Sequence, residues 1–196
     1  MSRRRTKAPG ELEPLRGRVR EGARWSVAVV VYRGVTTAEV ELPTTRLAEQ
    51  LDAEVVFVGV EPGELHGVEP SRTVVADRGP GDDHLPDLLV IPGGLGWKQV
   101  AEEERLTTWI ARASDHARGI LAISTGTLLL AAVGRLVGRQ ATGHWLAEHD
   151  LAAMGADVQA ERVAHAEAGR LITASGRLAA AGAVDELASR VSWAPG

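Results

Sequence analysis

The most informative segment of the chain is Ile120-Leu121-Ala122-Ile123-Ser124-Thr125-Gly126-Thr127-Leu128-Leu129-Leu130-Ala131-Ala132-Val133. Residues 120–123 form a short apolar run that predicts a buried strand, and residues 127–133 predict a helix that packs against it. Small residues flank Ser124, with Ala122 two positions before it and Gly126 two positions after it. This spacing allows a tight, strained turn. It is the pattern of a nucleophile elbow, with Ala122 in place of the usual glycine.

An elbow of this kind would hold the Ser124 hydroxyl at the carboxyl edge of a sheet, beside the backbone N–H groups of a helix N-terminus. A substrate oxygen can be polarised at such a point. The same Ser-Thr-Gly sequence is also an ordinary capping sequence, in which Ser or Thr accepts hydrogen bonds from the first free N–H groups of a helix. The local sequence leaves both interpretations open.

Composition limits the type of protein that can carry this site. The chain has 196 residues, 44% of them hydrophobic, with 22 Gly, one Phe and one Tyr, which suits one domain with an Ala/Val/Leu core. No apolar run approaches the roughly 20 residues that span a bilayer, and Arg3, Arg4 and Arg5 follow Met1 where a signal peptide would have an apolar core. We therefore expect a cytoplasmic protein with no membrane partner. The absence of Cys excludes disulfides, thiolate metal sites and a cysteine nucleophile.

Charge divides the chain into two parts. Residues 1–24 contain 8 Lys/Arg and 3 Asp/Glu, whereas the rest of the chain is acidic. Four helix breakers and a lack of apolar periodicity in the first segment predict a disordered basic arm over residues 1–24, followed by a single α/β domain over residues 25–196. An acidic body without a basic helix argues against a nucleic-acid partner.

Apolar runs alternate with amphipathic segments through the body of the chain, which is typical of parallel strands buried on both faces between helices. The predicted strands cover 26–32, 53–60, 72–76, 87–91, 120–123, 158–164 and 170–174. One predicted helix begins at Pro43, and the other predicted helices cover 99–117, 127–133, 146–154 and 179–191. Open α/β sheets bind ligands outside the carboxyl ends of their strands. Three loops meet that description, namely 33–43, 92–97 and 124–127.

Three segments resemble the ThiJ/PfpI superfamily. They are Ile91-Pro92-Gly93-Gly94-Leu95-Gly96, the elbow over residues 123–131, and Gly138-Arg139-Gln140-Ala141-Thr142-Gly143-His144-Trp145. Their spacing is also similar, and the resemblance covers roughly residues 26–190. The elbow and the Ala-Thr-Gly-His-Trp segment are most similar to the isonitrile hydratase-like branch and to the sensor domains of some AraC-type regulators. The resemblance implies a flavodoxin-like three-layer sandwich with a mostly parallel central sheet, the class I glutamine amidotransferase-like fold. It further implies a homodimer that binds a small molecule without a cofactor.

The resemblance also assigns two site residues. Members of this superfamily carry a cysteine at the elbow and hydrogen-bond it to a carboxylic acid from the first βα loop. Ser124 stands in the position of that cysteine. Glu39 matches the acid, in a segment where family members often have Asp-x-x-Gly-Pro and this chain has Leu42 in place of the glycine. A Ser hydroxyl is a far weaker acid than a thiol, whose reference pKa is about 8.5, so it needs a base in contact.

Three roles remain for the site. In the first, Ser124 is a nucleophile that His144 or Glu39 activates, as in a serine hydrolase. In the second, Glu39 is the general acid and base of a hydratase, lyase, cyclase or isomerase, and Ser124 only donates or accepts a hydrogen bond. In the third, the site binds a ligand and catalyses nothing. We favour the second role, because the family's acid is present in the sequence.

The remaining candidates would bind the ligand or stabilise an oxyanion. These candidates are Gly93, Gly94, Leu95, Thr125, Trp97 and Trp145. Each has a purely structural alternative: Trp97 and Trp145 can be packing residues, His144 can be a loop residue bonded to backbone, and Glu39 can be an exposed helix-start carboxylate. The other histidines show no metal-ligand spacing, so no metal site is expected.

Overall fold

The computed structural model describes residues 12–69, 72–81 and 85–193. Its centre is a six-stranded sheet in the order β2-β1-β5-β6-β10-β9. The strands are β1 (Trp25–Val30), β2 (Ala53–Val58), β5 (Leu88–Ile91), β6 (Gly119–Ile123), β9 (Val163–Ala166) and β10 (Leu171–Ala174). All neighbours in the sheet are parallel except β9, which pairs antiparallel with β10. Strands β5, β6 and β10 are buried along their whole length, as expected of parallel strands covered on both faces.

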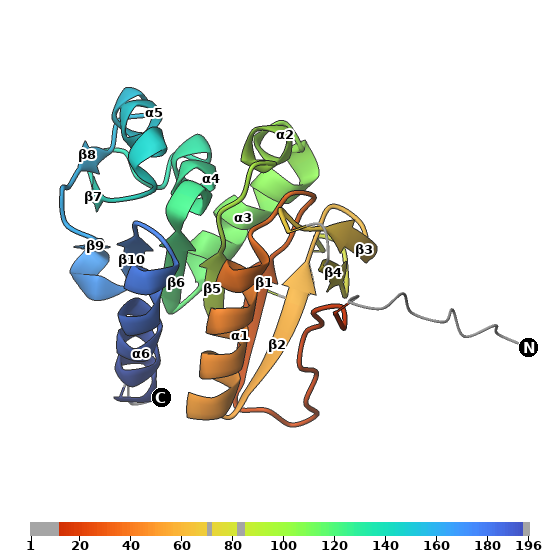
Figure 1. Ribbon diagram of the computed structural model, residues 1–196. Coiled ribbons are helices and arrows are strands. Elements are labelled where there is room, and N and C mark those ends of the chain that lie inside the picture. The colour runs from red at the N-terminus through yellow and green to blue at the C-terminus, as the bar shows by residue number, and fades with distance from the viewer. Residues whose placement is uncertain (1–11, 70–71, 82–84, 194–196) are drawn as a thin grey trace, which may run out of the picture.

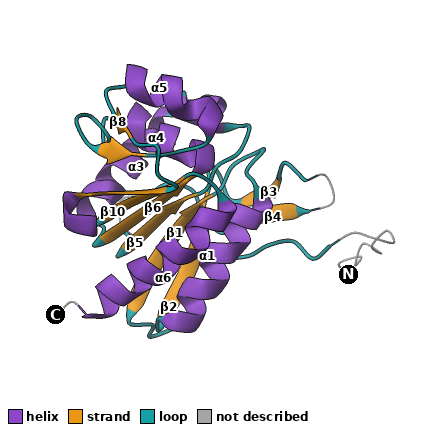
Figure 2. Ribbon diagram, turned by 60° about the vertical axis from the view of Figure 1, so that its left-hand side comes forward, coloured by secondary structure: helices purple, strands orange, loops and turns teal. Residues whose placement is uncertain are grey.

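Helices cover both faces of this sheet, which makes a three-layer sandwich (Figure 1). Figure 2 shows α1 (Thr37–Gln50) and α6 (Arg177–Trp193) side by side on one face. On the opposite face, α3 (Glu104–His116) packs against α4 (Thr127–Ala132). Two short helices, α2 (Trp97–Ala101) and α5 (Glu148–Ala153), lie above the carboxyl edge of the sheet, at the top of Figure 1. The predicted α/β sandwich with a mostly parallel sheet is confirmed.

Several helix boundaries differ from the prediction. Helix α1 begins at Thr37, so Pro43 lies inside the helix and the predicted start at Pro43 is wrong. A proline inside a helix removes one backbone hydrogen bond, and its ring crowds the carbonyl four residues earlier; the burial of one side of α1 offsets this cost. The predicted helix 99–117 is divided into α2 and α3, because Glu103 has an extended backbone.

Short elements complete the chain. Strands β3 (Gly63–His66) and β4 (Thr73–Ala76) form an antiparallel pair, and β7 (Gln140–Ala141) pairs in parallel with β8 (Asp157–Val158). The 3₁₀ turns are η1 (Ser124–Gly126), η2 (Trp145–Ala147) and η3 (Glu167–Gly169). The described helices include none that is long and apolar enough to cross a bilayer.

The N-terminal segment closes one edge of the sheet. Arg18 exchanges two backbone hydrogen bonds with Val55 of β2, and Leu15 bonds the backbone of β4 in the same way. The Asp77 carboxylate accepts a further bond from the Phe57 N–H at 2.7 Å. Two residues of the predicted arm, Leu15 and Arg18, thus pair their backbone groups with strands, and the domain boundary at residue 24 stays a prediction. Residues 1–11 of the predicted arm lie outside the described residues.

Candidate active site

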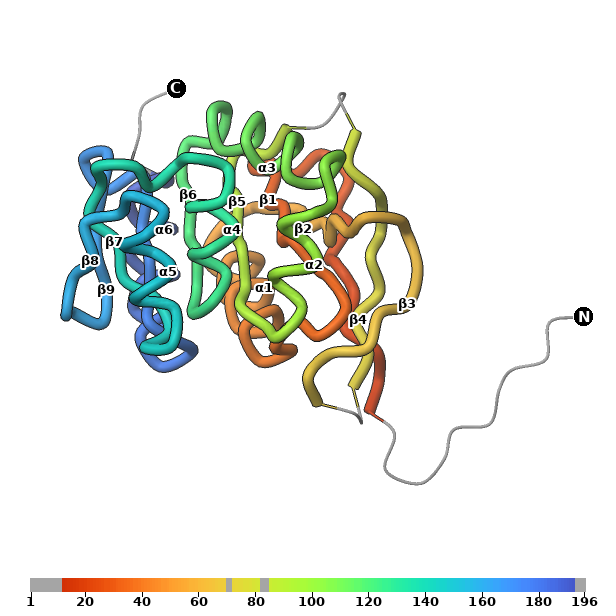
Figure 3. The backbone as a smooth tube through the Cα atoms, turned by 90° about the horizontal axis from the view of Figure 1, so that it is seen from above, coloured from red at the N-terminus to blue at the C-terminus, as the bar shows by residue number. Residues whose placement is uncertain are grey.

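Three loops meet at the carboxyl edge of the sheet, after β1, β5 and β6. Val35 forms an isolated bridge with Gly94, and the Thr36 N–H donates to the Gly93 carbonyl at 2.8 Å. The Gly94 N–H in turn donates to Thr125 Oγ1 at 2.8 Å. These bonds confirm the predicted convergence of segments 33–43, 92–97 and 124–127. Figure 3 shows the molecule from above, looking onto this edge.

The turn at Ser124 is strained, as the elbow pattern predicts. Ser124 has a φ of 58°, in the left-handed region that residues other than glycine rarely adopt. Its carbonyl accepts a buried hydrogen bond of 2.7 Å from Thr127 Oγ1. A Cβ on Gly126 would lie 2.2 Å from the Ile91 carbonyl oxygen, so only glycine fits there. The small residues of the elbow thus let β6 and its following helix lie tight against β5.

Glu39 is a buried carboxyl group in the first turn of α1. Its residue is only 5% exposed, and its Oε2 accepts a hydrogen bond of 2.8 Å from the Gly93 N–H. Burial is the largest influence on this group and raises its pKa above the ordinary value, because a charged carboxylate is costly away from water. The negative Glu69 raises the pKa further, whereas the Gly93 N–H and the positive Arg177 lower it.

Glu39 and Ser124 both lie next to Gly93. A Cβ built on Gly93 would lie 2.8 Å from Glu39 Oε2, 2.8 Å from Ser124 Cβ and 2.9 Å from the Thr125 nitrogen. No side chain fits at Gly93, because these three groups all lie close to the same point. Ser124 is 7% exposed, and its Oγ has no hydrogen-bond partner among the described residues. A hydroxyl that lacks a partner is available to a ligand.

Two of the predicted oxyanion donors are already used inside the protein. The Gly94 N–H bonds Thr125 Oγ1, and the Leu95 N–H donates to the Gly34 carbonyl at 2.9 Å. Neither N–H reaches a ligand unless that bond breaks. The Thr125 N–H lies in the first turn of η1, where a backbone N–H has no intrahelical partner. Of these three donors, Thr125 is the one whose nitrogen lies close to Gly93, 2.9 Å from the position of an added Cβ.

The His144 ring hydrogen-bonds a backbone group of its own loop. Its Nδ1 accepts a hydrogen bond of 3.2 Å from the Leu146 N–H, and its ring is tilted against Trp145 with 5.8 Å between centroids. Among the described residues, no hydrogen bond joins His144 to Ser124. The backbone of Gly143 is the neighbour instead, since a Cβ there would lie 3.1 Å from the Ser124 carbonyl oxygen. In this structure His144 is a loop residue that caps η2.

The two tryptophans have different surroundings. Trp97 begins α2, packs partly buried against the core, and has the Lys98 ammonium 5.5 Å from its ring. Trp145 is 70% exposed. Neither indole lies beside Gly93 in the way that Glu39 and Ser124 do, so a ligand role for them stays a prediction.

The sequence profile of the family described as "DJ-1/PfpI family" matches residues 25–188. This chain belongs to the DJ-1/PfpI family. The isonitrile hydratase of Pseudomonas putida is 40% identical over 65 residues, which make up 33% of this chain and 28% of the hydratase. The chain therefore matches less than a third of that relative's length.

Solved structures agree with the fold of this DJ-1/PfpI protein. A two-domain protein of Anabaena variabilis with DJ-1/ThiJ/PfpI-like and ferritin-like domains has a TM-score of 0.78 at 24% identity, covering 87% of this chain and 49% of that one. A ThiJ/PfpI family protein of Pseudomonas syringae has a TM-score of 0.75 at 25% identity, covering 88% and 76%. Drosophila melanogaster DJ-1beta has a TM-score of 0.75 at 20% identity, covering 85% and 89%.

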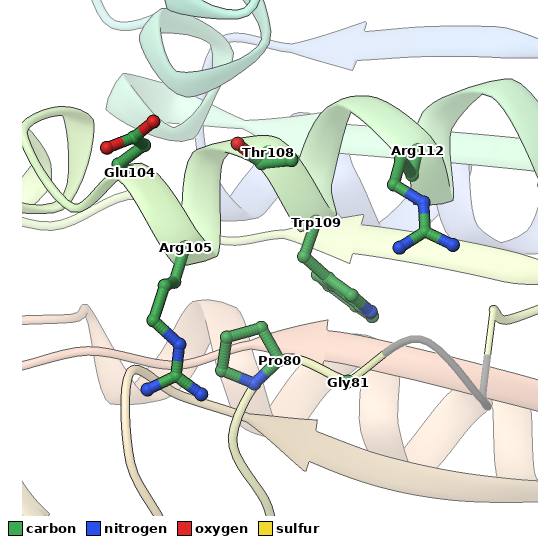
Figure 4. Close-up of a pocket in the computed structure, with 7 residues that line it drawn as sticks. All are labelled: Pro80, Gly81, Glu104, Arg105, Thr108, Trp109 and Arg112. Carbon is green, nitrogen blue, oxygen red and sulfur yellow. The ribbon is translucent and has the colours of Figure 1, made fainter.

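Two surface pockets of this DJ-1/PfpI protein lie away from the elbow. One of about 390 Å³ is situated between α3 and Pro80–Gly81 (Figure 4). Figure 4 shows Arg105 and Trp109 directed towards this loop and Glu104 directed away from it. A second pocket, of about 350 Å³, extends from Tyr32 to α2. Neither contains Ser124 or Glu39, and the described residues hold no cluster of side chains suited to a metal ion.

Sequence reasoning missed two hydroxyl groups that support the site. Thr127 fixes the Ser124 carbonyl, and Tyr32 donates a buried hydrogen bond of 2.9 Å to the Pro92 carbonyl. Tyr32 is the only tyrosine in the chain and follows a continuous apolar strand. A polar tip on a residue at the carboxyl end of a buried strand was the available signal.

Proposed function

We propose that this DJ-1/PfpI protein is a small-molecule enzyme in which Glu39 is the general acid and base and Ser124 holds the reacting group by a hydrogen bond. The observation that carries the proposal is the grouping at Gly93, where a buried carboxyl with a raised pKa lies near a hydroxyl that has no hydrogen-bond partner among the described residues. Catalysis by proton transfer is most efficient when the pKa of the acid lies near the working pH, and burial moves Glu39 in that direction. Hydration, lyase, cyclisation and isomerisation reactions all use such a group.

An alkyl isonitrile is the first probe, because the matched relative is named an isonitrile hydratase. In the proposed reaction, protonated Glu39 donates its proton to the terminal isonitrile carbon, and a water molecule adds to that carbon. A proton of the added water returns to Glu39, and tautomerisation gives the N-alkyl formamide. The sum is one isonitrile plus one water to one formamide, and no covalent bond to Ser124 forms.

The proposal is tested by following the formyl proton of the product by NMR with wild type, Ser124→Ala and Glu39→Gln. Turnover in the first two proteins and its loss in the third would support acid–base catalysis by Glu39. Turnover that persists in Glu39→Gln would overturn it.

A serine hydrolase is the second candidate, and the strained backbone of Ser124 favours it. Against it stands the lack of a base in contact with Ser124 Oγ among the described residues. We therefore expect a fluorophosphonate to label the wild-type protein no more than it labels Ser124→Ala, as measured by intact-protein mass spectrometry. Labelling of the wild type that disappears in Ser124→Ala would establish a serine nucleophile and exclude the simple acid–base role.

We also expect this protein to be a homodimer. Three apolar side chains in loops at the carboxyl edge are widely exposed: Leu95 at 83%, Trp145 at 70% and Leu146 at 63%. Exposed apolar surface of this kind is often covered by a partner. Light scattering should give twice the chain mass of 20.8 kDa. Trp145→Asp should weaken association, whereas Val137→Asp, at another exposed apolar residue, serves as the matched control. The mass of a single chain at high concentration would contradict the expectation.

A further inference from the structure

We propose that Tyr32 is a positioning residue that holds the Glu39 carboxyl group in place through the peptide group between Pro92 and Gly93. The inference deepens the proposed function and rests on it, because it assigns a residue that orients the proposed acid and base. Tyr32 touches neither Glu39 nor Ser124 through a hydrogen bond of its own. It acts through the backbone between them.

Two hydrogen bonds use opposite ends of one peptide group. The Tyr32 hydroxyl donates to the Pro92 carbonyl oxygen at 2.9 Å, and the Gly93 N–H donates to Glu39 Oε2 at 2.8 Å. The Pro92 carbonyl and the Gly93 N–H belong to the same planar, delocalised unit. Fixing the oxygen therefore also fixes the direction of the N–H. Hydrogen bonds in series polarise one another, so the phenol strengthens the bond that the N–H makes to Glu39.

The segment needs this anchor because of its composition. Pro92 has no N–H with which to hold its own position, and Gly93 has no side chain to restrict its backbone. The Thr36 N–H donates to the Gly93 carbonyl at 2.8 Å and so holds the peptide group after Gly93. The peptide group before Gly93 is held by the Tyr32 hydroxyl. Tyr32 is itself firmly placed, since it is 2% exposed at the end of β1.

The phenol stays protonated under all working conditions. Burial raises the pKa of Tyr32 far above its ordinary value, and the negative charge of Glu39 raises it further. The hydroxyl is therefore a permanent donor to Pro92. Two other charged groups act on Glu39 from elements packed around it, Glu69 from the loop after β3 and Arg177 from the start of α6. Neither bonds the Pro92–Gly93 peptide, so their effect on the pKa of Glu39 should stay the same when Tyr32 is changed.

Removing the phenol and strengthening it should have opposite effects on Glu39. Without the hydroxyl, the Gly93 N–H stabilises the carboxylate less, so the pKa of Glu39 should rise in Tyr32→Phe. Because Tyr32 is the only tyrosine, growth on 3-fluorotyrosine changes this residue alone. The fluorinated phenol is a stronger donor, so the pKa of Glu39 should fall. A merely structural role would not give shifts of opposite sign.

The experiment is an NMR titration of ¹³C-labelled glutamate side chains, with the Glu39 signal assigned by its absence in Glu39→Gln. The control is Ser114→Ala, which removes a buried hydroxyl that donates 2.7 Å to the Ile110 carbonyl in α3. It should leave the Glu39 titration unchanged. If Tyr32→Phe folds poorly, the fluorotyrosine protein decides alone. An unchanged Glu39 titration in the fluorotyrosine protein would overturn the inference.

This readout needs no substrate, so it separates the two proposals. Shifts of opposite sign in a protein without turnover would support the role of Tyr32 and count against the proposed function only. Where turnover is found, Tyr32→Phe should lower kcat about fivefold, the equivalent of one ordinary hydrogen bond, with little change in KM.

Discussion

Replacing Glu39 by Gln should lower the turnover of this DJ-1/PfpI protein by about 10²–10⁴-fold, which is the usual contribution of a general acid or base. The amide oxygen of Gln can still accept the hydrogen bond of 2.8 Å that the Gly93 N–H makes, so the loop keeps its place. The amide cannot give or take a proton at working pH. Ser124→Ala removes one hydrogen bond to the substrate and should cost about fivefold to tenfold.

The Glu39→Gln variant should also be more stable than the wild type at neutral pH. Glu39 has a pKa that burial raises above 4.5, so the folded state holds its proton more tightly than the unfolded state. Wild-type stability therefore falls as the pH rises from about 4.5 through the folded-state pKa, and the penalty is complete above that value. Glu39→Gln has no buried charge at this position, so its free energy of unfolding at pH 8 should be about 1 kcal/mol higher than that of the wild type. Such gains are common when a residue kept for function is replaced.

Thermal unfolding at pH 4 and pH 8 measures this effect. The two proteins should unfold with similar free energies at pH 4, where Glu39 is protonated in both states, and differ at pH 8. A wild type that is the more stable protein at pH 8 would mean that the charged carboxylate stabilises the fold. That result would remove the physical basis of the acid–base role.

Gly126→Ala should destabilise the protein by about 3 kcal/mol or more, because it overpacks a rigid contact. An added Cβ would lie 2.2 Å from the Ile91 carbonyl oxygen and 2.6 Å from that of Pro92. Both atoms are backbone and cannot rotate away. The φ of Gly126 is −61°, which alanine adopts freely, so the whole effect comes from the close approach. Chemical denaturation monitored by tryptophan fluorescence gives the free energy of unfolding.

Gly182→Ala is the matched control for that measurement. Gly182 is an exposed residue within α6, and nothing lies within 4 Å of an added Cβ. Alanine in a helix interior is up to about 1 kcal/mol more favourable than glycine, so this variant should be slightly more stable. Similar losses in both variants would show that the elbow is not packed as tightly as the distances indicate.

Much of the fold could be predicted from the sequence, because a strand that is buried on both faces has a continuous apolar sequence. The strand around Val27, the strand around Val90 and the one before Ser124 could be predicted for that reason. The elbow could be predicted because a close approach of two backbones demands small residues at fixed positions. In both cases the constraint is local, so the sequence carries it.

The errors arose where distant residues decide the structure. Pro43 is typical of a first helical turn, yet α1 begins six residues earlier because its buried side packs on the sheet. The contact of Glu39 with Gly93 joins residues 54 positions apart. The His144 ring accepts a hydrogen bond from the Leu146 N–H, which the loop path decides, and a role as a base for Ser124 stays a prediction. No local pattern specifies such contacts.

Leu15 pairs with β4 and Arg18 pairs with β2, so the folded part of the chain includes these residues. The family match begins at residue 25, but a fragment cut there would lose the backbone partners that Leu15 and Arg18 provide. It would leave the β2 backbone at Val55 without that partner, and an unpaired strand edge is a template for pairing between chains and hence for aggregation. A fragment for expression and crystallisation should therefore begin before Leu15, ahead of the region that the family has in common.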